Sequence, residues 1–358
     1  MRLLYSVSPS SMDDSMRNYT GHGGKWARWC VWDIFKEKGY SLMVHDWLKR
    51  LSDCEPFDVV LAMQYLYNVQ SAIGPETMVM LRTTTAYADY HNQMAMDRVD
   101  EINHRRGALL NYKRLQKPGE LTAEAIEQAD YIVGVGNEFI KNTFPERVRD
   151  KINMTDNVRA YIGKVDIRES IPEQRGWLWH FGSGAIHKGL DLCLEAFAKH
   201  PEWELHVTAN LSYEPDILKE FAYEFQLPNI HYYGWLSSSS AKFRSIVDKC
   251  VGFLGPTCSE GQSPAVATCL SLGLYPVISR QSGIDLPNIN GITHCGIYLQ
   301  DLTIEDVENK VALIMDLPDY SILNEIRIIQ QDALWRYSQE RFRDVMTEHI
   351  ERALNAKS

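Results

Sequence analysis

Trp179-His180-Phe181-Gly182-Ser183-Gly184-Ala185-Ile186-His187-Lys188-Gly189-Leu190-Asp191-Leu192 combines a hydrophobic strand, a glycine turn and the start of an amphipathic helix. Glycines let the backbone approach an anion closely, and a helix amino terminus adds partial positive charge and free N–H groups. Lys188 adds a full charge, so the stretch predicts a diphosphate site. His187 stands where a Walker loop and a dinucleotide-binding GxGxxG fingerprint both require glycine, which excludes these two motifs. The alternative is a turn that needs glycine for steric reasons alone.

Strand-like and helical segments alternate on both sides of this stretch. Short buried strands are expected before it at 3–7, 41–45, 57–62, 77–81 and 131–135. After residue 157 strands are expected at 177–181, 204–208, 230–233, 251–254 and 275–278, with helices at 188–200, 213–226, 238–249 and 263–272. Two successive βα arrays predict an α/β protein with two Rossmann-like, doubly wound parallel sheets. Such sheets face a cleft at the carboxyl ends of their strands.

The boundary between the two units is expected between Arg159 and Gly176, where the periodicity fades and the segment becomes polar. We therefore predict an amino-terminal domain over 1–164 and a carboxyl-terminal domain over 165–337. The helices expected from Ile322 onward have no strand after them, so they must pack on the sheets that precede them.

The composition excludes several classes of protein. The chain has 358 residues, of which 45% are hydrophobic, and 37 Lys and Arg stand against 47 Asp and Glu, for a net charge of −10. This balance argues against a general nucleic-acid-binding protein. No apolar run approaches the roughly 20 residues that span a bilayer, and the first residues do not resemble a signal peptide, so a cytoplasmic location is expected. The seven scattered cysteines contain no CxxC pair, which indicates reduced thiols without a structural zinc site.

A second informative stretch runs from Gly255 to Ser279, where a strand ends in a polar turn before a helix. We expect Glu260, Gln262 and Ser263 to project into the cleft from the carboxyl edge of the sheet. A carboxylate there can accept hydrogen bonds from two vicinal hydroxyls, and the N–H groups of residues 261–263 would face an anion. The alternative is that Ser259 or Glu260 only caps the helix.

The two stretches, in this order and spacing, resemble the carboxyl-terminal domain of GT-B glycosyltransferases, and more closely glycosyltransferase family 4 of the bacterial polysaccharide-assembly type. The resemblance implies that the turn at 182–184 and Lys188-Gly189 bind the diphosphate of a nucleotide sugar. It also implies that Glu260, the first glutamate of a Glu-x7-Glu motif, contacts the donor. Thr268 stands at the position of the second glutamate, and Ser183 at the position of a common arginine. Thr268 could still offer a hydroxyl to the ribose.

The resemblance extends to other parts of the chain. It implies that Gly234 and Trp235 line the pocket for the base, although Trp235 could instead be a core aromatic. It implies that a helix at about 338–358 crosses back and completes the first domain. The catalytic residues implied are Lys188 and Glu260. The donor-binding residues implied are Gly182, Ser183, Gly184, His187, Lys188, Gly234, Trp235, Glu260, Gly261, Gln262, Ser263 and Thr268.

The first domain is where acceptors bind in this family. The glycine-rich segment 18–25 follows the first strand, so it either closes over a ligand or forms a plain turn. Arg82 and Thr83 follow the fourth strand, where several relatives carry a histidine, and His91 is a loose substitute for it. The acceptor-side residues expected are His22, Gly23, Gly24, Lys25, Arg82 and Thr83.

The segment 98–119 carries a local charge of +4 in an acidic protein, since Arg98, Arg105, Arg106, Lys113, Arg114 and Lys117 outnumber Asp100 and Glu101. Interleaved leucines and a tyrosine would let it rest on anionic lipid headgroups or grip a phosphorylated, lipid-linked acceptor. The alternative, which we favour, is a solvated helix face.

The resemblance implies a hexosyltransferase that moves a sugar from a nucleoside diphosphate sugar to a glycan or lipid-linked acceptor, with retention at the anomeric carbon, in cell-surface polysaccharide synthesis. No Asp-x-Asp occurs in the chain, so we expect neither a metal ion nor another cofactor. Two alternatives stay open. One is a nucleotide-sugar epimerase, with His22, His91 and His187 as its acid/base candidates. The other is a pseudo-enzyme or binding subunit, favoured by Ser183 and Thr268.

Overall fold

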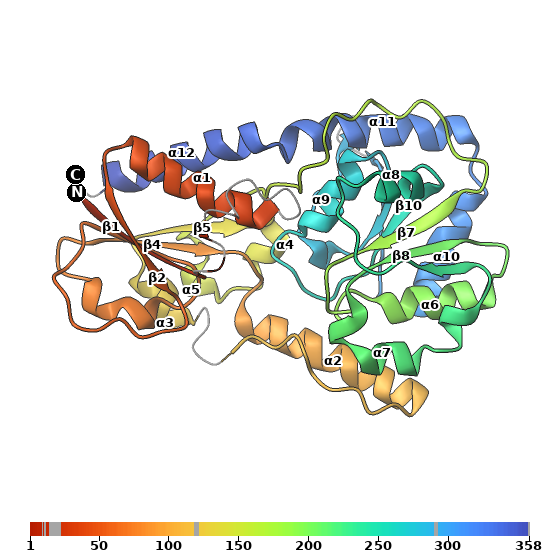
Figure 1. The fold of residues 1–358 in the computed structure, drawn as a ribbon, viewed down its shortest axis with the longest axis horizontal. Helices are drawn as coiled ribbons and strands as arrows, with labels where there is room; N and C mark the ends of the chain where they lie inside the picture. The colour runs from red at the N-terminus through yellow and green to blue at the C-terminus, as the bar shows by residue number, and fades with distance from the viewer. Residues whose placement is uncertain (9, 11, 14–22, 118–121, 290–292, 357–358) are drawn as a thin grey trace.

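Two six-stranded parallel sheets follow one another along the chain in the computed structural model, which describes all residues except 9, 11, 14–22, 118–121, 290–292 and 357–358 (Figure 1). The first sheet has the order β2-β1-β3-β4-β5-β6. Its strands are β1 (Arg2–Val7), β2 (Ser41–Asp46), β3 (Val59–Ala62), β4 (Met78–Thr83), β5 (Tyr131–Val135) and β6 (Ile152–Thr155). All ten predicted strands are confirmed, and the two doubly wound sheets with them.

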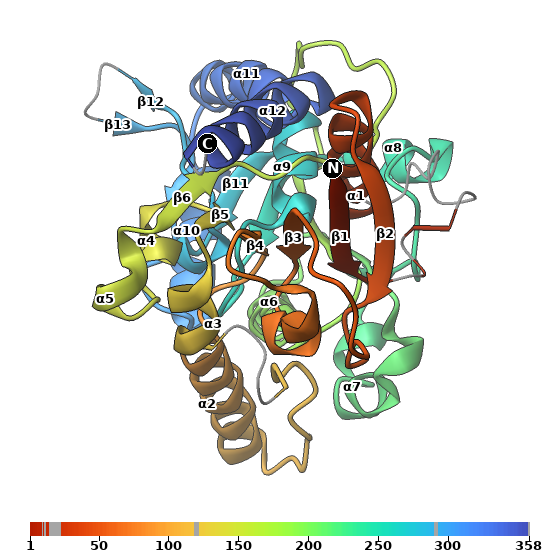
Figure 2. The ribbon, with the colours of Figure 1, turned by 90° about the vertical axis from the view of Figure 1, so that its left-hand side faces the viewer.

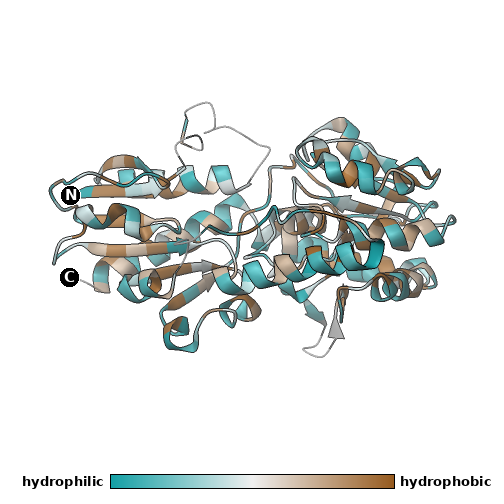
Figure 3. Ribbon diagram, turned by 90° about the horizontal axis from the view of Figure 1, so that it is seen from below, coloured by the Kyte–Doolittle hydropathy of each residue, from teal (hydrophilic) through white to brown (hydrophobic). Residues whose placement is uncertain are grey.

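The second sheet has the order β14-β11-β10-β7-β8-β9. Its strands are β7 (Gly176–His180), β8 (Leu205–Thr208), β9 (Ile230–Tyr232), β10 (Cys250–Gly255), β11 (Tyr275–Ile278) and β14 (Ile297–Tyr298), and a small antiparallel ribbon joins β12 (Asn288–Ile289) to β13 (Thr293–His294). Every residue of β8, β10 and β11 is buried, because helices cover both faces of a parallel sheet. Figure 3 accordingly shows hydrophobic residues along the strands of both sheets.

Helices connect the strands and cover the sheets. They are α1 (Gly23–Glu37), α2 (Ala88–Arg106), α3 (Ala123–Gln128), α4 (Glu138–Lys141), α5 (Glu146–Arg149), α6 (Leu190–Lys199), α7 (Pro215–Glu220), α8 (Ala241–Val247), α9 (Pro264–Ser271), α10 (Ile304–Met315), α11 (Asp319–Arg336) and α12 (Gln339–Ala356), with short turns η3 (Leu66–Ala72), η4 (Leu211–Tyr213), η5 (Glu224–Gln226) and η6 (Arg280–Ser282). The continuous helix predicted at 213–226 is wrong, because Phe221 leaves the helical conformation (φ −101°, ψ 25°) and separates α7 from η5. The helix predicted from residue 238 begins later, since the Ser240 hydroxyl caps α8. None of the helices in the described part of the chain has the length and apolarity to span a bilayer.

The last helix, α12, packs on the first sheet, although α11 before it packs on the second. Phe342, Met346 and Ile350 share a core with Leu3 and Tyr5 of β1. Figures 1 and 2 show α12 beside α1, with both chain ends at the same end of the molecule. The chain therefore crosses between the two sheets twice.

One segment of the first domain packs on the second. Val99 and Ile102 of α2, with Ala108 and Leu110 after it, are buried in the core of the second sheet. Figure 1 shows α2 alongside α6 and α7. We call residues 88–117 the strap. A domain boundary at residue 164 therefore does not account for the strap, which precedes that residue in the sequence but packs on the second sheet.

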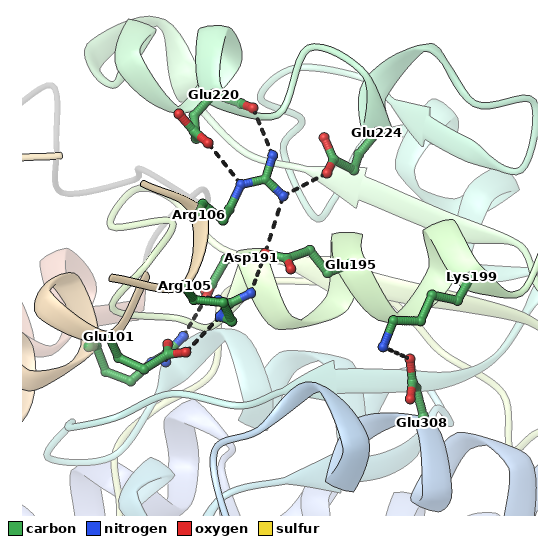
Figure 4. Close-up of polar contacts among 10 residues, drawn as sticks. Glu101, Arg105, Arg106, Asp191, Glu195, Lys199, Glu220, Glu224 and Glu308 are labelled. Atoms are coloured by element: carbon green, nitrogen blue, oxygen red, sulfur yellow. Dashed lines mark hydrogen bonds and ion pairs between the residues drawn. The ribbon is translucent and has the colours of Figure 1, made fainter. Parts of the chain in front are cut away.

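Acidic side chains of the second domain hold the strap in place (Figure 4). The Asp191 carboxylate on α6 accepts hydrogen bonds from Arg98 (2.6 Å) and Arg105 (3.0 Å). The guanidinium of Arg106 contacts Glu220 and Glu224, each at 2.8 Å. Lys113 forms an ion pair with Asp216, and Arg105 a second one with Glu195. The interpretation of this segment as a solvated helix face is therefore wrong, and these four cations are paired inside the protein and not free for a membrane.

Candidate active site

A cavity of about 270 Å³ lies at the carboxyl ends of β7 and β10. The strand order of the second sheet reverses between these two strands, which is where open α/β sheets bind their ligands. Gly23 at the start of α1, Arg114 of the strap and Ala160 after β6 complete its wall from earlier parts of the chain. The predicted residues that line it are Gly23, Gly182, Ser183, Lys188, Trp235, Glu260, Ser263 and Thr268.

Lys188 and Glu260 meet at the wall of this cavity as an ion pair. The Lys188 ammonium lies 5.4 Å from the centre of the Phe181 ring, and the Thr257 hydroxyl donates to Glu260 Oε1 at 3.4 Å. Burial and the nearby Arg114 guanidinium lower the pKa of Lys188, whereas the Glu260 carboxylate favours its charged form. We take the ion pair to dominate, because the two charged groups are in direct contact. The arrangement places a charged ammonium at a cavity that an anion could enter.

The glycine turn does not present all its N–H groups to the cavity. The carboxylate of Glu214, itself buried, accepts hydrogen bonds from the backbone N–H of Gly184 (2.6 Å) and of Ala185 (3.0 Å). The expectation that Gly184 would offer its N–H to a diphosphate is therefore wrong in this structure, because a protein carboxylate already holds that group. Gly182 and Ser183 do line the cavity.

His187 is buried behind the turn and does not line this cavity. Its Nε2–H donates to the carbonyl of Ser259 at 2.5 Å, so the ring is the Nε2-protonated tautomer and Nδ1 accepts from the Cys258 thiol at 3.3 Å. Burial lowers the pKa of His187, which keeps the ring neutral. His187 therefore joins the two predicted stretches to each other instead of contacting a ligand.

His91 makes a similar connection. Its Nε2–H donates to the backbone carbonyl of Arg114 at 2.7 Å, and its Nδ1 accepts from the Ser259 hydroxyl at 3.1 Å. Burial lowers its pKa to about 4. Both ring nitrogens are occupied, so His91 does not serve as the histidine at the transferred sugar.

The second stretch contributes to the cavity through Glu260, Ser263 and the start of α9, but Gln262 points elsewhere. Gln262 accepts from the backbone N–H of Asn157 at 2.5 Å and donates to Asp156 at 2.7 Å, so it ties the chain after β6 to the second domain. Gly261 approaches the first domain so closely that a Cβ there would lie 2.3 Å from the Thr84 carbonyl oxygen. The predicted ligand roles of Gln262 and Gly261 are therefore corrected to contacts between the domains.

Thr268 lines the cavity, yet its hydroxyl is occupied. It donates to the carbonyl of Pro264 at 2.6 Å and accepts from the N–H of Ala160 at 3.1 Å. Its proton is therefore not available to a ribose hydroxyl, contrary to expectation.

Trp235 is half exposed and lines the cavity, so the alternative of a core aromatic is wrong for it. Gly234 before it has a φ of +71° and forms the turn without lining the cavity. Trp235 therefore supplies a flat aromatic surface at the cavity, and Gly234 forms the turn that precedes it.

The acceptor-side residues are separated by the structure. Gly23 lines the cavity, Gly24 and Lys25 follow it in α1 without lining it, and His22 lies outside the described residues. Arg82 and Thr83 are buried in the first sheet, so the expectation that they stand at the cleft is wrong. Burial lowers the pKa of Arg82, whose guanidinium lies 5.5 Å from the Phe342 ring.

Sequence reasoning missed several residues of the cavity wall. His180 precedes Phe181 at the end of β7, a position that a strand-end argument could have identified. Its Nδ1 lies 2.7 Å from the Thr208 hydroxyl, and burial lowers its pKa to about 4. Ala160 carried no local signal, and Arg114 was named only as one cation of the basic segment 98–119. Both reach the cavity through long-range packing. Within the described residues, no three His, Cys, Asp or Glu side chains converge as metal ligands would.

Several solved glycosyltransferase structures are similar in fold to this chain. No family model matches the sequence, and no curated protein does. A sucrose-phosphate synthase from Thermosynechococcus elongatus matches with a TM-score of 0.67 at 12% identity, over 100% of this chain and 99% of that one. A glycosyltransferase from Rickettsia africae matches with a TM-score of 0.62 at 10% identity, over 99% and 98%. HepE from Anabaena, solved with UDP and glucose, matches with a TM-score of 0.55 at 10% identity, over 99% and 100%.

Proposed function

The chain has the GT-B fold, with two Rossmann-like doubly wound domains facing a cleft, and we propose that it is a glycosyltransferase using a nucleoside diphosphate sugar. The observation that carries the proposal is the cavity at the switch point of the second sheet, which Lys188 and Glu260 line together with Trp235 and the start of α9. A cation and a helix amino terminus suit a diphosphate, and an exposed indole suits a base. HepE, solved with UDP-glucose, supports the choice of donor.

In this reaction negative charge develops on the diphosphate as the bond to the anomeric carbon breaks. Lys188 stabilises that charge, which is the electrostatic task of such a site. Glu260, freed from part of its pairing as the ammonium turns toward phosphate, accepts hydrogen bonds from sugar hydroxyls and orients the donor. The proposal includes retention at the anomeric carbon, a reaction without a metal ion, and a glycan or lipid-linked acceptor in cell-surface polysaccharide synthesis, as the sequence resemblance implies.

The test begins with thermal shifts of the purified protein against UDP, GDP, ADP and CMP and their sugar conjugates, with and without magnesium, because a ligand of the folded state raises its stability. We expect one nucleoside diphosphate to stabilise the protein without magnesium. Turnover of the matching donor is then compared in Lys188→Ala, Glu260→Gln and the control Lys199→Ala, whose side chain is exposed on α6. The first two should lose turnover by orders of magnitude. Wild-type turnover in either of them would refute the assignment of the site.

A binding subunit without turnover is the second candidate, because two features occupy groups that a transferase would use. Glu214 holds the N–H groups of Gly184 and Ala185, and the proton of the Thr268 hydroxyl is donated to the Pro264 carbonyl. Stabilisation by a nucleoside diphosphate with no turnover of any donor would favour it. The epimerase has less support, since His91 and His187 use both ring nitrogens within the protein.

A further inference from the structure

Arg114 is an exposed guanidinium on the wall of the candidate donor cavity, contributed by the strap and not by the second domain. Its side chain packs against the glycine turn, where a Cβ on Gly184 would lie 3.1 to 3.3 Å from Cδ, Cγ and Nε of Arg114. Among the described residues, no carboxylate pairs with it and no hydrogen bond satisfies its guanidinium. Arg98, Arg105, Arg106 and Lys113 of the same segment, by contrast, are all paired with acids of the second domain.

The backbone that carries Arg114 is held by two neighbouring residues of α2, His91 and Asn92. His91 donates to the Arg114 carbonyl, and its other nitrogen accepts from Ser259, the residue before Glu260. Two residues on, Gln116 exchanges hydrogen bonds with the Asn92 side chain at 2.7 and 3.1 Å. The strap therefore places this arginine in a defined position relative to the catalytic pair.

Arg114 and Lys188 line the same cavity. The positive charge of Arg114 lowers the pKa of the Lys188 ammonium, in addition to the effect of burial. Glu260 offers a single negative charge to this pair of cations. Two like charges at one cavity repel each other until an anion enters between them. A diphosphate carries enough charge for both, and a planar guanidinium can bind two phosphate oxygens at once.

We propose that Arg114 is a ligand for the diphosphate of the donor, supplied across the domain boundary and positioned by the ion pairs of the strap. This inference rests on the proposed function. If Arg114 binds the diphosphate, the donor site is incomplete without the strap. The isolated second domain would therefore bind the diphosphate more weakly than the full chain.

The test measures dissociation constants of the stabilising nucleoside diphosphate, its monophosphate and the nucleoside by titration calorimetry. In Arg114→Ala the diphosphate should bind about 10- to 100-fold more weakly, the range for a lost hydrogen bond between charged groups, while the nucleoside binds as before. Arg114→Lys should recover part of the loss. The charge-matched control is Arg147→Ala, an exposed pair with Glu127 in the first domain.

Positioning is tested by a second change, Arg106→Ala, which removes the contacts to Glu220 and Glu224. We expect it to weaken diphosphate binding only where Arg114 is present, so that the double variant binds like Arg114→Ala alone. Unchanged diphosphate affinity in Arg114→Ala, with affinity lost in Lys188→Ala, would overturn the inference and leave the proposed function standing. No binding of any nucleoside diphosphate by the wild type would overturn both.

Discussion

Replacing Asp191 with asparagine should lower the free energy of unfolding by about 3 kcal/mol, because this carboxylate neutralises two arginines of the strap. Asp191 is completely buried at the start of α6, and the Arg98 side chain is 7% exposed. Asparagine keeps the size of the side chain and removes its charge. The change therefore isolates the electrostatic contribution of the contact.

The magnitude follows from burial and from the contacts that remain. Removing one partner of a buried ion pair costs roughly 3 to 5 kcal/mol, because the other charge stays buried without compensation. Arg98 and Arg105 both keep hydrogen bonds to Glu101, whose side chain is 44% exposed, so the lower end of that range applies. The ion pair of Lys199, on the same helix as Asp191, with Glu308 of α10 provides the contrast, since the Lys199 side chain is 58% exposed. Such a pair contributes roughly 0 to 1 kcal/mol.

The assay is urea denaturation followed by tryptophan fluorescence, with wild type, Asp191→Asn and Lys199→Ala compared at pH 7. With a denaturant dependence of about 3 kcal/mol per molar urea, a loss of about 3 kcal/mol moves the midpoint by about 1 M. Lys199→Ala should move it by less than about 0.3 M. If the midpoint of Asp191→Asn falls no lower than that of Lys199→Ala, the strap is not anchored by this buried pairing.

Three further changes address other parts of the molecule. Arg82→Met should raise the urea midpoint, since it removes a buried guanidinium that has no hydrogen bond or ion pair within the described residues; a lower midpoint would contradict this. Gly261→Ala should lower the thermal midpoint, because the new Cβ would meet the Thr84 carbonyl at 2.3 Å, whereas Gly182→Ala meets open space and should not. Burial lowers the pKa of His91 to about 4 from 6.5, so its contribution to stability is complete above pH 6.5 and is lost as the pH falls toward 4. His91→Gln should therefore reduce the slope of stability against pH, measured by denaturation from pH 4.5 to 7, while other buried histidines such as His180 and His206 keep part of it.

The sheets could be predicted because a strand of a parallel sheet is buried on both faces and is therefore a short apolar run. Val59–Ala62 and Tyr275–Ile278 are such runs, and every residue in them is buried. The two strands of these six-stranded sheets that were missed lack that signal. Ile152–Thr155 lies at the edge of its sheet with its two central residues partly exposed, and Ile297–Tyr298 is only two residues long.

The candidate site could be predicted where its chemistry is local. Lys188 lies eight positions after the end of β7, and Glu260 lies five positions after the end of β10. Neighbouring strand ends meet at one edge of the sheet, so the approach of the two residues follows from the topology. The partners that occupy Gly184 and Gln262 are distant in sequence, and so is Ala160, which donates to the Thr268 hydroxyl. Gln262 binds Asn157, which lies 105 positions earlier, and no local pattern indicates such a contact.

The strap shows why counting charges in a segment does not reveal what those charges do. Its excess of cations was consistent with solvent, lipid or an anionic acceptor, because each of these can balance positive charge. Asp191 lies 86 positions after Arg105, and Glu224 lies 118 positions after Arg106, so the acids that balance them belong to a different part of the fold. Once those pairs are assigned, Arg114 is a cation of the strap that lines the cavity and that no carboxylate of the described residues pairs with. A ligand site can thus be identified by subtracting the charges that the fold itself neutralises, which requires the three-dimensional structure.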